Sequence, residues 1–230
     1  MAFTLTDRGG GTGVYASSIT ASDTFTPATN AMVVCAIAHD GETMTVSGFG
    51  VTFTQIATKV GTSSRDLDVY AALIPSPTSG NVVITGSSVS AYAATTEIEG
   101  VDSSGTVSAA FPQTPTSAAV YSPSSPYALP SLAAFDSSTN LSLTIGQLSS
   151  SGEIVADTGY TEAAYTSASS SVGIFYKASS DTSQRLVASD YFSYRHLVGF
   201  AMEIAEAGGG GGGFQVAWAR QANQTIKVTL

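Results

Sequence analysis

Residues 66–99 read DLDVYAALIPSPTSGNVVITGSSVSAYAATTEIE, and residues 172–205 read VGIFYKASSDTSQRLVASDYFSYRHLVGFAMEIA. In both stretches a strand-like run with a tyrosine leads through a Thr-Ser turn into an apolar run, and a long apolar run ends in Glu-Ile. Tyr70 and Tyr176 are 106 residues apart, and so are the two Glu-Ile pairs. This equal spacing predicts a duplicated β unit, although stretches rich in Val, Ala and Tyr also align by chance.

The similarity extends the predicted repeat to two half-units, residues 31–100 and 128–206, related by a pseudo-two-fold axis. Within them, the run 128–136 resembles the run 31–40. Residues 111–126, between the halves, hold four of the eight prolines. Because each proline removes a donor from a strand ladder, we expect this segment to be a crossover outside the sheets.

Strand-like runs recur about every eight to twelve residues, with Gly, Pro, Asn, Asp or Ser between them. They lie near 18–25, 31–38, 43–47, 51–58, 66–74, 81–86, 91–99, 105–110, 153–157, 171–178, 184–189 and 197–205. No window shows a sustained helical period, so no helix longer than about two turns is expected. Residues 1–13, with their glycine run, are expected to form a flexible arm or a loose first loop. The pattern predicts an all-β, antiparallel β-sandwich of jelly-roll or Greek-key type.

Composition supports one sandwich domain over residues 1–207. The chain has 230 residues, of which 43% are hydrophobic and only 11% charged, so Ser, Thr, Gly, Asn and Gln must cover most of the surface. Small polar residues suit the outer faces of strands, and low charge with high hydrophobicity argues against disorder. A sandwich of this length can be a single domain.

The net charge of -9 and the sequence pI near 4.4 argue against nucleic acid as a partner. The eight basic residues are scattered and form no cluster that could follow a phosphate backbone. The longest apolar run, 31–38, is too short to span a bilayer, so no membrane is expected. The N-terminus lacks the pattern of a classical secretion signal. Cys35 is the only cysteine, which excludes an intrachain disulfide and suggests a buried, inert thiol.

No motif for catalysis, a cofactor or a metal is found. The two histidines, His39 and His196, have no second cysteine to complete a structural zinc site. A His-Asp-Ser triad could be assembled on paper, but no strand–G-x-S-x-G–helix context exists, so an enzyme is not expected. Asp66 with Asp68, and likewise Glu97 with Glu99, share a strand face, and we expect these faces to be solvated. The alternatives, a sugar-cleaving carboxylate pair or a calcium site, lack further support.

Six tyrosines are expected in loops among Ser and Gly. Such tyrosines suit a sugar- or protein-binding surface, and they can equally wedge loops onto the sandwich. They are Tyr121, Tyr127, Tyr160, Tyr165, Tyr191 and Tyr194.

The C-terminal segment stands apart from the sandwich. Residues 208–213 are six glycines that form a linker, spanning about 13 Å as a coil and about 20 Å when stretched. Residues 214–230 alternate twice around a polar turn, which predicts a β-hairpin. A lone hairpin is marginal, so its apolar faces must dock on its own sandwich or on a neighbouring subunit. The predicted partner-binding residues are Phe214, Val216, Trp218, Ile226, Val228 and Leu230.

The chain resembles the virion surface and tail-associated proteins of tailed bacteriophages. The resemblance rests on a short Met-Ala start, strands dominated by Ser, Thr, Ala and Gly, and three runs: VSGFGVTFT at 46–54, LDVYAA at 67–72 and AWARQANQ at 217–224. It implies a non-enzymatic, usually oligomeric sandwich, trimers included, that attaches to capsid or tail proteins. It also implies synthesis in the bacterial host cytoplasm followed by incorporation into the virion.

Two functions from different classes follow. The first is a structural protein that decorates or cements the capsid, with a tail component as a close variant. The second is a carbohydrate-binding or receptor-binding module of a tail or fibre, in which tyrosine-bearing loops grip a host-surface glycan.

Overall fold

The chain forms antiparallel β-sheets and almost nothing else. In the computed structural model, the structure describes residues 2–61, 65–121, 125–149, 152–168, 170–188 and 196–207. Within these ranges the single helical element is a 3-10 turn, η1 (Val107–Ala110). The prediction of an all-β fold is therefore confirmed, whereas the strand expected at 105–110 is wrong.

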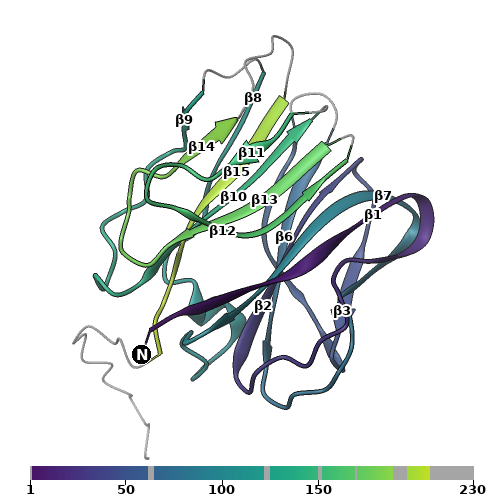
Figure 1. Cartoon of the computed structure of the whole chain (residues 1–230), viewed down its shortest axis with the longest axis horizontal. Helices are drawn as coiled ribbons and strands as arrows, with labels where there is room; N and C mark the ends of the chain where they lie inside the picture. Colours follow the sequence, from purple (N-terminus) through teal and green to yellow (C-terminus); the bar gives the residue numbers. More distant parts are fainter. Residues whose placement is uncertain are drawn as a thin grey trace, which may run out of the picture.

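The first sheet contains seven strands in the order β4-β3-β7-β2-β6-β5, and β1 pairs with β7 beside this path. All its pairings are antiparallel. In Figure 1 these strands form the lower right half of the molecule. The strands are β1 (Thr4–Thr20), β2 (Ala31–His39), β3 (Thr45–Gly48), β4 (Val51–Thr52), β5 (Thr54–Lys59), β6 (Asp66–Ile74) and β7 (Val83–Glu99).

This first sheet curls strongly into a half-barrel. Its two end strands, β4 and β5, are separated in sequence by Phe53 alone, so the chain passes directly from one end of the sheet to the other. The Phe53 N–H donates to the carbonyl of Val46, and the Phe53 ring is buried inside the curl. The single strand expected at 51–58 is therefore split in two by the curvature.

The second sheet has five strands in the order β12-β13-β10-β15-β8, and a third, small sheet has the order β11-β14-β9. Figure 1 shows both in the upper left half of the molecule. The strands are β8 (Thr116–Tyr121), β9 (Tyr127–Ala128), β10 (Leu141–Ser149), β11 (Ile154–Val155), β12 (Thr161–Ser167), β13 (Ser170–Lys177), β14 (Arg185–Ala188) and β15 (His196–Ile204).

The sheets stack in layers around three apolar cores. The largest core lies between the first and second sheets and takes side chains from β2, β6 and β7 on one side and β10, β13 and β15 on the other. A second core fills the inside of the curled first sheet. A third lies between the second sheet and the small sheet that covers its outer face. Three layers explain why the central strands read as continuous apolar runs, since both of their faces are buried.

The strand β2 illustrates this double burial. All nine of its residues are buried. Val33 and Ile37 point into the curl, whereas Met32 and Val34 point toward the second sheet. Burying each side chain of this size stabilises the fold by about 1.5–3 kcal/mol.

The N-terminal segment is a long strand, so the expected flexible arm is wrong. β1 pairs with β7 over most of its length, with shifts of register near its glycines. A Cβ on Gly10 would lie 1.7 Å from the Thr166 hydroxyl, and a Cβ on Gly11 would lie 1.9 Å from the carbonyl oxygen of Thr20. The glycines therefore permit close approach of neighbouring chain segments rather than flexibility.

The proline-rich segment does contribute a strand, contrary to its expected role as a crossover. Its residues 116–121 form β8, which pairs with β15 and lies at one end of the second sheet. Pro115 directly precedes this strand. Proline is tolerated at the start of an edge strand, because the missing donor falls where no ladder bond is needed.

The first two sheets share a strand order. In the first, β2 pairs with β6 and β7, and β5 lies beyond β6; in the second, β10 pairs with β13 and β15, and β12 lies beyond β13. This order is what a duplicated unit would show, and the duplication stays a prediction. The run 128–136 does not correspond to the run 31–40, because residues 129–140 contain no strand. Instead, β10 takes the place in the second sheet that β2 has in the first.

The two tyrosines used to align the halves face different cores. Tyr70 lies inside the curl of the first sheet, whereas Tyr176 packs against the core between the two sheets. By the registers of the ladders, Phe175 rather than Tyr176 corresponds to Tyr70. The 106-residue offset thus matches strand positions at the Glu-Ile pairs and slips by one residue at the tyrosines.

Candidate functional site

The predicted partner-binding residues of the tail lie outside the described residues. These are Phe214, Val216, Trp218, Ile226, Val228 and Leu230. The glycine linker 208–213 lies outside them as well. The candidate site is therefore built from the surface that the described sheets offer to a partner.

A pocket opens on the side of the molecule where β5 and β8 face each other. Its volume is about 260 Å³. Both strands are end strands of their sheets, and each pairs along one side only within the described residues. The walls and floor are Gln55, Ile56, Ala57, Thr58, Thr114, Pro115, Ser117 and Phe200. We call this surface the β5–β8 groove.

The groove combines an apolar floor with polar walls. Phe200 is a buried member of the core between the two sheets, and Ile56 and Ala57 pack against the same core from β5. Thr114 lies exposed on the β8 side. An apolar floor beside strand edges with free backbone groups is the arrangement that accepts an added strand. No signal in the sequence alone pointed to this surface.

A buried polar cluster surrounds His39 inside the curl, behind the β5 wall of the groove. His39 Nδ1 accepts the Gly41 N–H at 3.1 Å, and His39 Nε2 lies 3.2 Å from Asp68 Oδ2. The second contact becomes an ion pair when the ring is protonated, and its alignment falls short of a regular hydrogen bond. Asp68 also interacts with the side chains of Gln55 and Thr58, both of which line the groove.

The cluster shifts the pKa values of His39 and Asp68 in opposite directions. Burial alone lowers the pKa of His39, but the Asp68 carboxylate, helped by the charges of Asp66 and Glu42, outweighs it and raises that pKa above the usual value. Burial likewise favours the protonated form of Asp68, yet its contacts with His39 and Thr58 lower the pKa of the carboxyl overall. The contact between His39 and Asp68 therefore adds a side-chain link to the ladder that joins β2 and β6.

This geometry does not fit His39 as the general base of a catalytic triad. A general base needs one ring nitrogen on the orienting carboxylate and the other facing a nucleophile. Here the second nitrogen accepts a backbone N–H from Gly41. Within the described residues, no group of three or more His, Cys, Asp or Glu side chains is placed to hold a metal ion.

The solvated carboxylate faces expected from the sequence are wrong at two of four positions. Asp68 and Glu97 are buried, whereas Asp66 is half-buried and Glu99 is exposed. Partners from other strands compensate the buried charges: His39 for Asp68, and Arg8 for Glu97. Burial of a carboxylate needs such partners, and the sequence pattern alone did not name them.

Glu97 ties three segments together. Its carboxylate accepts Arg8 Nε at 2.8 Å and also contacts Arg8 Nη2, which anchors β1. It accepts the backbone N–H of Ala28 at 2.6 Å, which anchors the loop before β2. Charge-assisted bonds of this kind are stronger than neutral ones.

In the second sheet, Glu203 also ties three segments together, but its partners are neutral. Its carboxylate accepts Gln113 Nε2 at 2.5 Å, Asn140 Nδ2 at 2.6 Å and the backbone N–H of Asp136 at 3.2 Å. The side chain is fully buried. It therefore anchors the segment before β8 and the loop before β10 to β15.

The tyrosines fall into three groups. Tyr121 is 50% exposed and its ring lies 4.7 Å from that of His196. Tyr127, Tyr160 and Tyr165 are not free loop residues: Tyr127 and Tyr160 pack against the third core, and the hydroxyls of Tyr160 and Tyr165 are buried. Burial is the main cause that raises the pKa of Tyr160 and of Tyr165. Tyr191 and Tyr194 lie outside the described residues.

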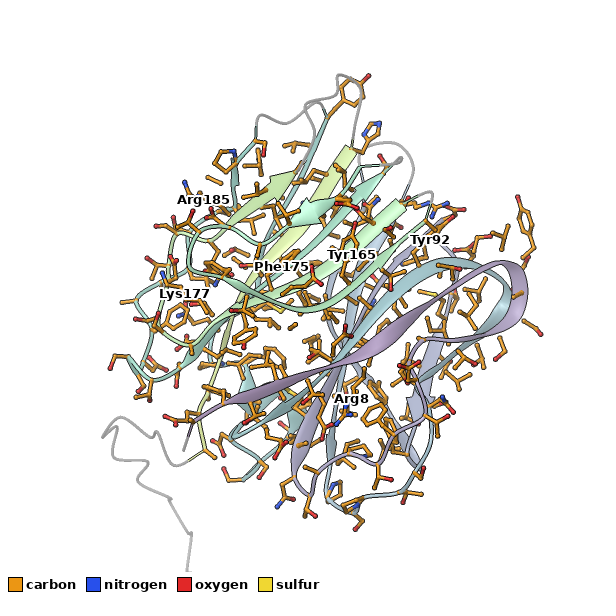
Figure 2. The ribbon with its side chains drawn as sticks, in the orientation of Figure 1. Arg8, Tyr92, Tyr165, Phe175, Lys177 and Arg185 are labelled. Carbon is orange, nitrogen blue, oxygen red and sulfur yellow. The ribbon has the colours of Figure 1, made fainter. Side chains whose placement is uncertain are left out.

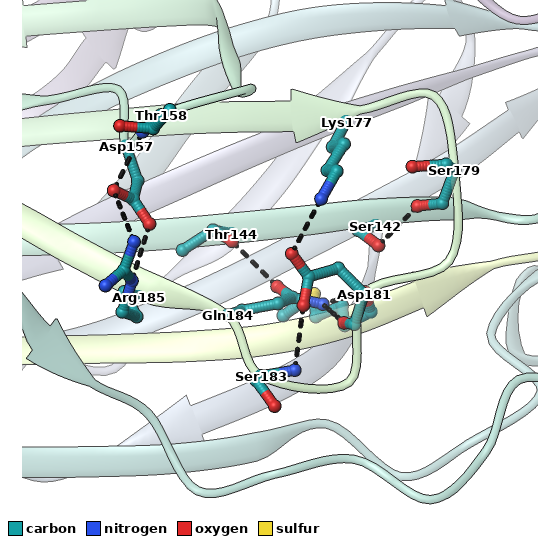
Figure 3. Close-up of polar contacts among 11 residues, drawn as sticks. Ser142, Thr144, Asp157, Thr158, Lys177, Ser179, Asp181, Ser183, Gln184 and Arg185 are labelled. Atoms are coloured by element: carbon teal, nitrogen blue, oxygen red, sulfur yellow. Dashed lines mark hydrogen bonds and ion pairs between the residues drawn. The ribbon is translucent and has the colours of Figure 1, made fainter.

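A second polar cluster joins the loop before β14 to the second sheet. Arg185 makes two bonds to Asp157, at 2.7 and 3.0 Å, and Lys177 Nζ lies 3.1 Å from Asp181. Gln184 is buried between Thr144 and the backbone of β15 (Figure 3). Figure 2 places Lys177 and Arg185 on the same side of the molecule, away from Arg8.

Cys35 is buried, as expected for an inert thiol. Burial raises the pKa of Cys35 to about 12, which keeps the thiol protonated at neutral pH.

The sequence did not predict two exposed apolar side chains on β1. They are Val14 and Tyr15, whose side chains are 63% and 80% exposed. Tyr15 has a positive φ of 54° at a shift of register between β1 and β7.

Among the described residues, no helix has the length and apolar character needed to cross a membrane. Comparisons of the chain with protein-family models, with curated proteins and with solved structures find no match.

Proposed function

We propose that this chain is a non-enzymatic structural protein of a phage virion, one that decorates or cements the capsid through oligomeric contacts. A tail-associated location is the close variant. The family assignment rests on the sequence resemblance alone. The jelly-roll or Greek-key description of the sandwich belongs to the same proposal.

The proposal of a non-enzymatic protein is supported by the contacts of the buried polar side chains. His39 contacts Asp68 and Gly41 through its two ring nitrogens, and Glu97 and Glu203 each join a strand to a distant loop. Such contacts fix strands and loops in place. Buried polar contacts that join distant segments rigidify a fold, and a rigid scaffold suits a protein that must hold a surface lattice together.

The tail is the proposed attachment element. Its six apolar residues, Phe214 to Leu230 in two alternating sets, are too apolar to stay in water, and the glycines before them supply reach. The partners are then other copies of this chain and capsid or tail proteins.

Mass spectrometry of purified particles tests the proposal. Virions are purified by density gradient from cells in which the phage that carries this gene is propagated, and their proteins are identified and counted. The proposal expects peptides of this chain in many copies per particle. Particles that form normally yet lack the chain would contradict it.

A second function is favoured by one observation, the exposed Tyr121 ring beside His196. An exposed aromatic ring can stack against a sugar, so a carbohydrate-binding or receptor-binding module is the alternative. A glycan array probed with the full chain and with Tyr121→Ala separates the two. Specific binding that the substitution abolishes favours the module, and silence on the array favours decoration.

A further inference from the structure

We propose that the β5–β8 groove is the acceptor for the first strand-like run of the tail, residues 214–220. This inference rests on the proposed function, in which the tail is the assembly element. It adds the surface that receives the tail and the way in which the tail is held.

The shape and chemistry of the groove fit one added strand. The four consecutive groove residues 55–58 of β5 present an unpaired strand edge, and the gap beside them opens onto Phe200. A strand added to this edge would extend the first sheet. Its inner face would then meet the core between the sheets, and its outer face would meet water.

The alternation of residues 214–220 matches this requirement. Phe214, Val216 and Trp218 share one face, and Gln215, Ala217 and Ala219 share the other. The first set would cover the groove floor, and the second set would form a small, mostly non-bulky outer face. Trp218 is the natural anchor, because tryptophan contributes most when buried in a pocket at the centre of an interface.

The end of the described chain lies within reach of the groove. Phe200 lies in β15, and Ala207 is seven residues further along the chain, so the two lie at most about 24 Å apart. From Ala207 the chain needs seven residues to reach Phe214, and these extend to at most about 25 Å. The groove of the same subunit is therefore accessible, and so is that of an adjacent copy.

Charge also favours docking of the tail on the body. All 17 acidic residues precede residue 208, whereas the segment 208–230 contains Arg220 and Lys227 and no acidic residue. Opposite charges raise the rate of encounter and orient the segments, while burial of the apolar face supplies most of the affinity.

Trp218 is the single tryptophan of the chain, so its fluorescence reports on the tail directly. The full chain is compared with Thr114→Arg, which places a charged side chain at the groove from an exposed position. Thr114→Ser serves as the conservative variant. Thr52→Arg, at an exposed position on the end strand β4, is the matched control.

The proposal expects a blue-shifted emission, protected from acrylamide quenching, in the full chain, in Thr114→Ser and in Thr52→Arg. In Thr114→Arg the emission should move to that of free tryptophan, with an unchanged circular dichroism melt. Water-like emission in the full chain overturns the proposal. So does a blue shift that Thr114→Arg leaves intact in a folded protein.

Dilution separates this inference from the proposed function. A groove-dependent blue shift that fades on dilution supports the groove and assembly between copies. One that is independent of concentration supports the groove but places the tail on its own subunit, which counts against tail-mediated assembly. Loss of oligomers on deletion of the tail, with emission insensitive to Thr114→Arg, overturns the groove and leaves the proposed function standing.

Discussion

Glu97 and Glu203 occupy corresponding positions in the two large sheets and perform the same structural task. Each directly precedes the isoleucine that points into the core between the sheets. Each is buried, and each accepts a backbone N–H from the loop that leads into the central strand of its sheet, from Ala28 in the first and from Asp136 in the second. The same type of contact therefore fixes the loop before the central strand in both sheets.

The two glutamates differ in the partners that compensate their charge, which leads to the first prediction. Glu97→Gln removes the charge that Arg8 pairs with and should lower the free energy of unfolding by about 1.5–3 kcal/mol. Glu203→Gln should cost less, because the named partners of Glu203 carry no charge. A glutamine oxygen in the place of Oε1 can also keep the bonds from Asn140 and from the Asp136 backbone. Urea unfolding followed by circular dichroism measures both.

Glu99→Gln controls for the loss of a carboxylate on the same strand. Glu99 is exposed, so its change should stay within about 0.5 kcal/mol. Equal costs for Glu97→Gln and Glu99→Gln would mean that the contacts of Glu97 with β1 contribute nothing to stability.

The second prediction concerns His39 and pH. Because the folded pKa of His39 is raised, its stabilising contribution is fully present below the unfolded value of about 6.5 and is lost as the pH rises through the folded pKa. The stability difference between the wild type and His39→Gln should therefore be larger at about pH 6 than at about pH 9. His196→Gln controls for the loss of an imidazole elsewhere.

Chemical unfolding at the two pH values measures this difference. A difference that grows with increasing pH would show that His39 is stabilised as the neutral form. The contact with Asp68 would then be a hydrogen bond without a charge on the ring.

The third prediction concerns the close approach at Gly10. A Cβ there would lie 1.7 Å from the Thr166 hydroxyl and 2.3 Å from the Ala93 carbonyl oxygen. Gly10→Ala should lower the free energy of unfolding by about 1–3 kcal/mol, since overpacking forces backbone shifts. Gly80→Ala is the matched control, because its nearest neighbour lies 3.7 Å away and its φ is not positive. Thermal melts that fall equally for both variants would count against the contact.

The sequence predicted the elements that depend on local pattern. The spacing of apolar runs predicted an all-β fold and a strand near 31–38, which the structure confirms as β2. The constant offset between the Glu-Ile pairs also found the two positions that correspond in the sheets, because Glu97 and Glu203 are fixed by the same loop contact.

The features that the sequence did not predict depend on contacts between distant residues. The glycine run of β1 looked flexible because the close neighbour of Gly10, Thr166, lies in another sheet. Glu97 looked solvated because its partner Arg8 lies 89 residues away. The β5–β8 groove depends on which strands end the two sheets, and strand order cannot be read from apolar spacing.

The most direct test of the proposed function is to truncate the chain after Ala207 and measure its mass in solution by sedimentation velocity, beside its thermal melt. If the tail is an assembly element, the full chain forms an oligomer, the truncated chain sediments as a monomer, and the melting temperature of the truncated chain, read at low concentration, is unchanged. A truncated chain that keeps the mass of the full chain would contradict this. A melt that collapses in a chain with no oligomer to lose would show that the tail only completes its own domain.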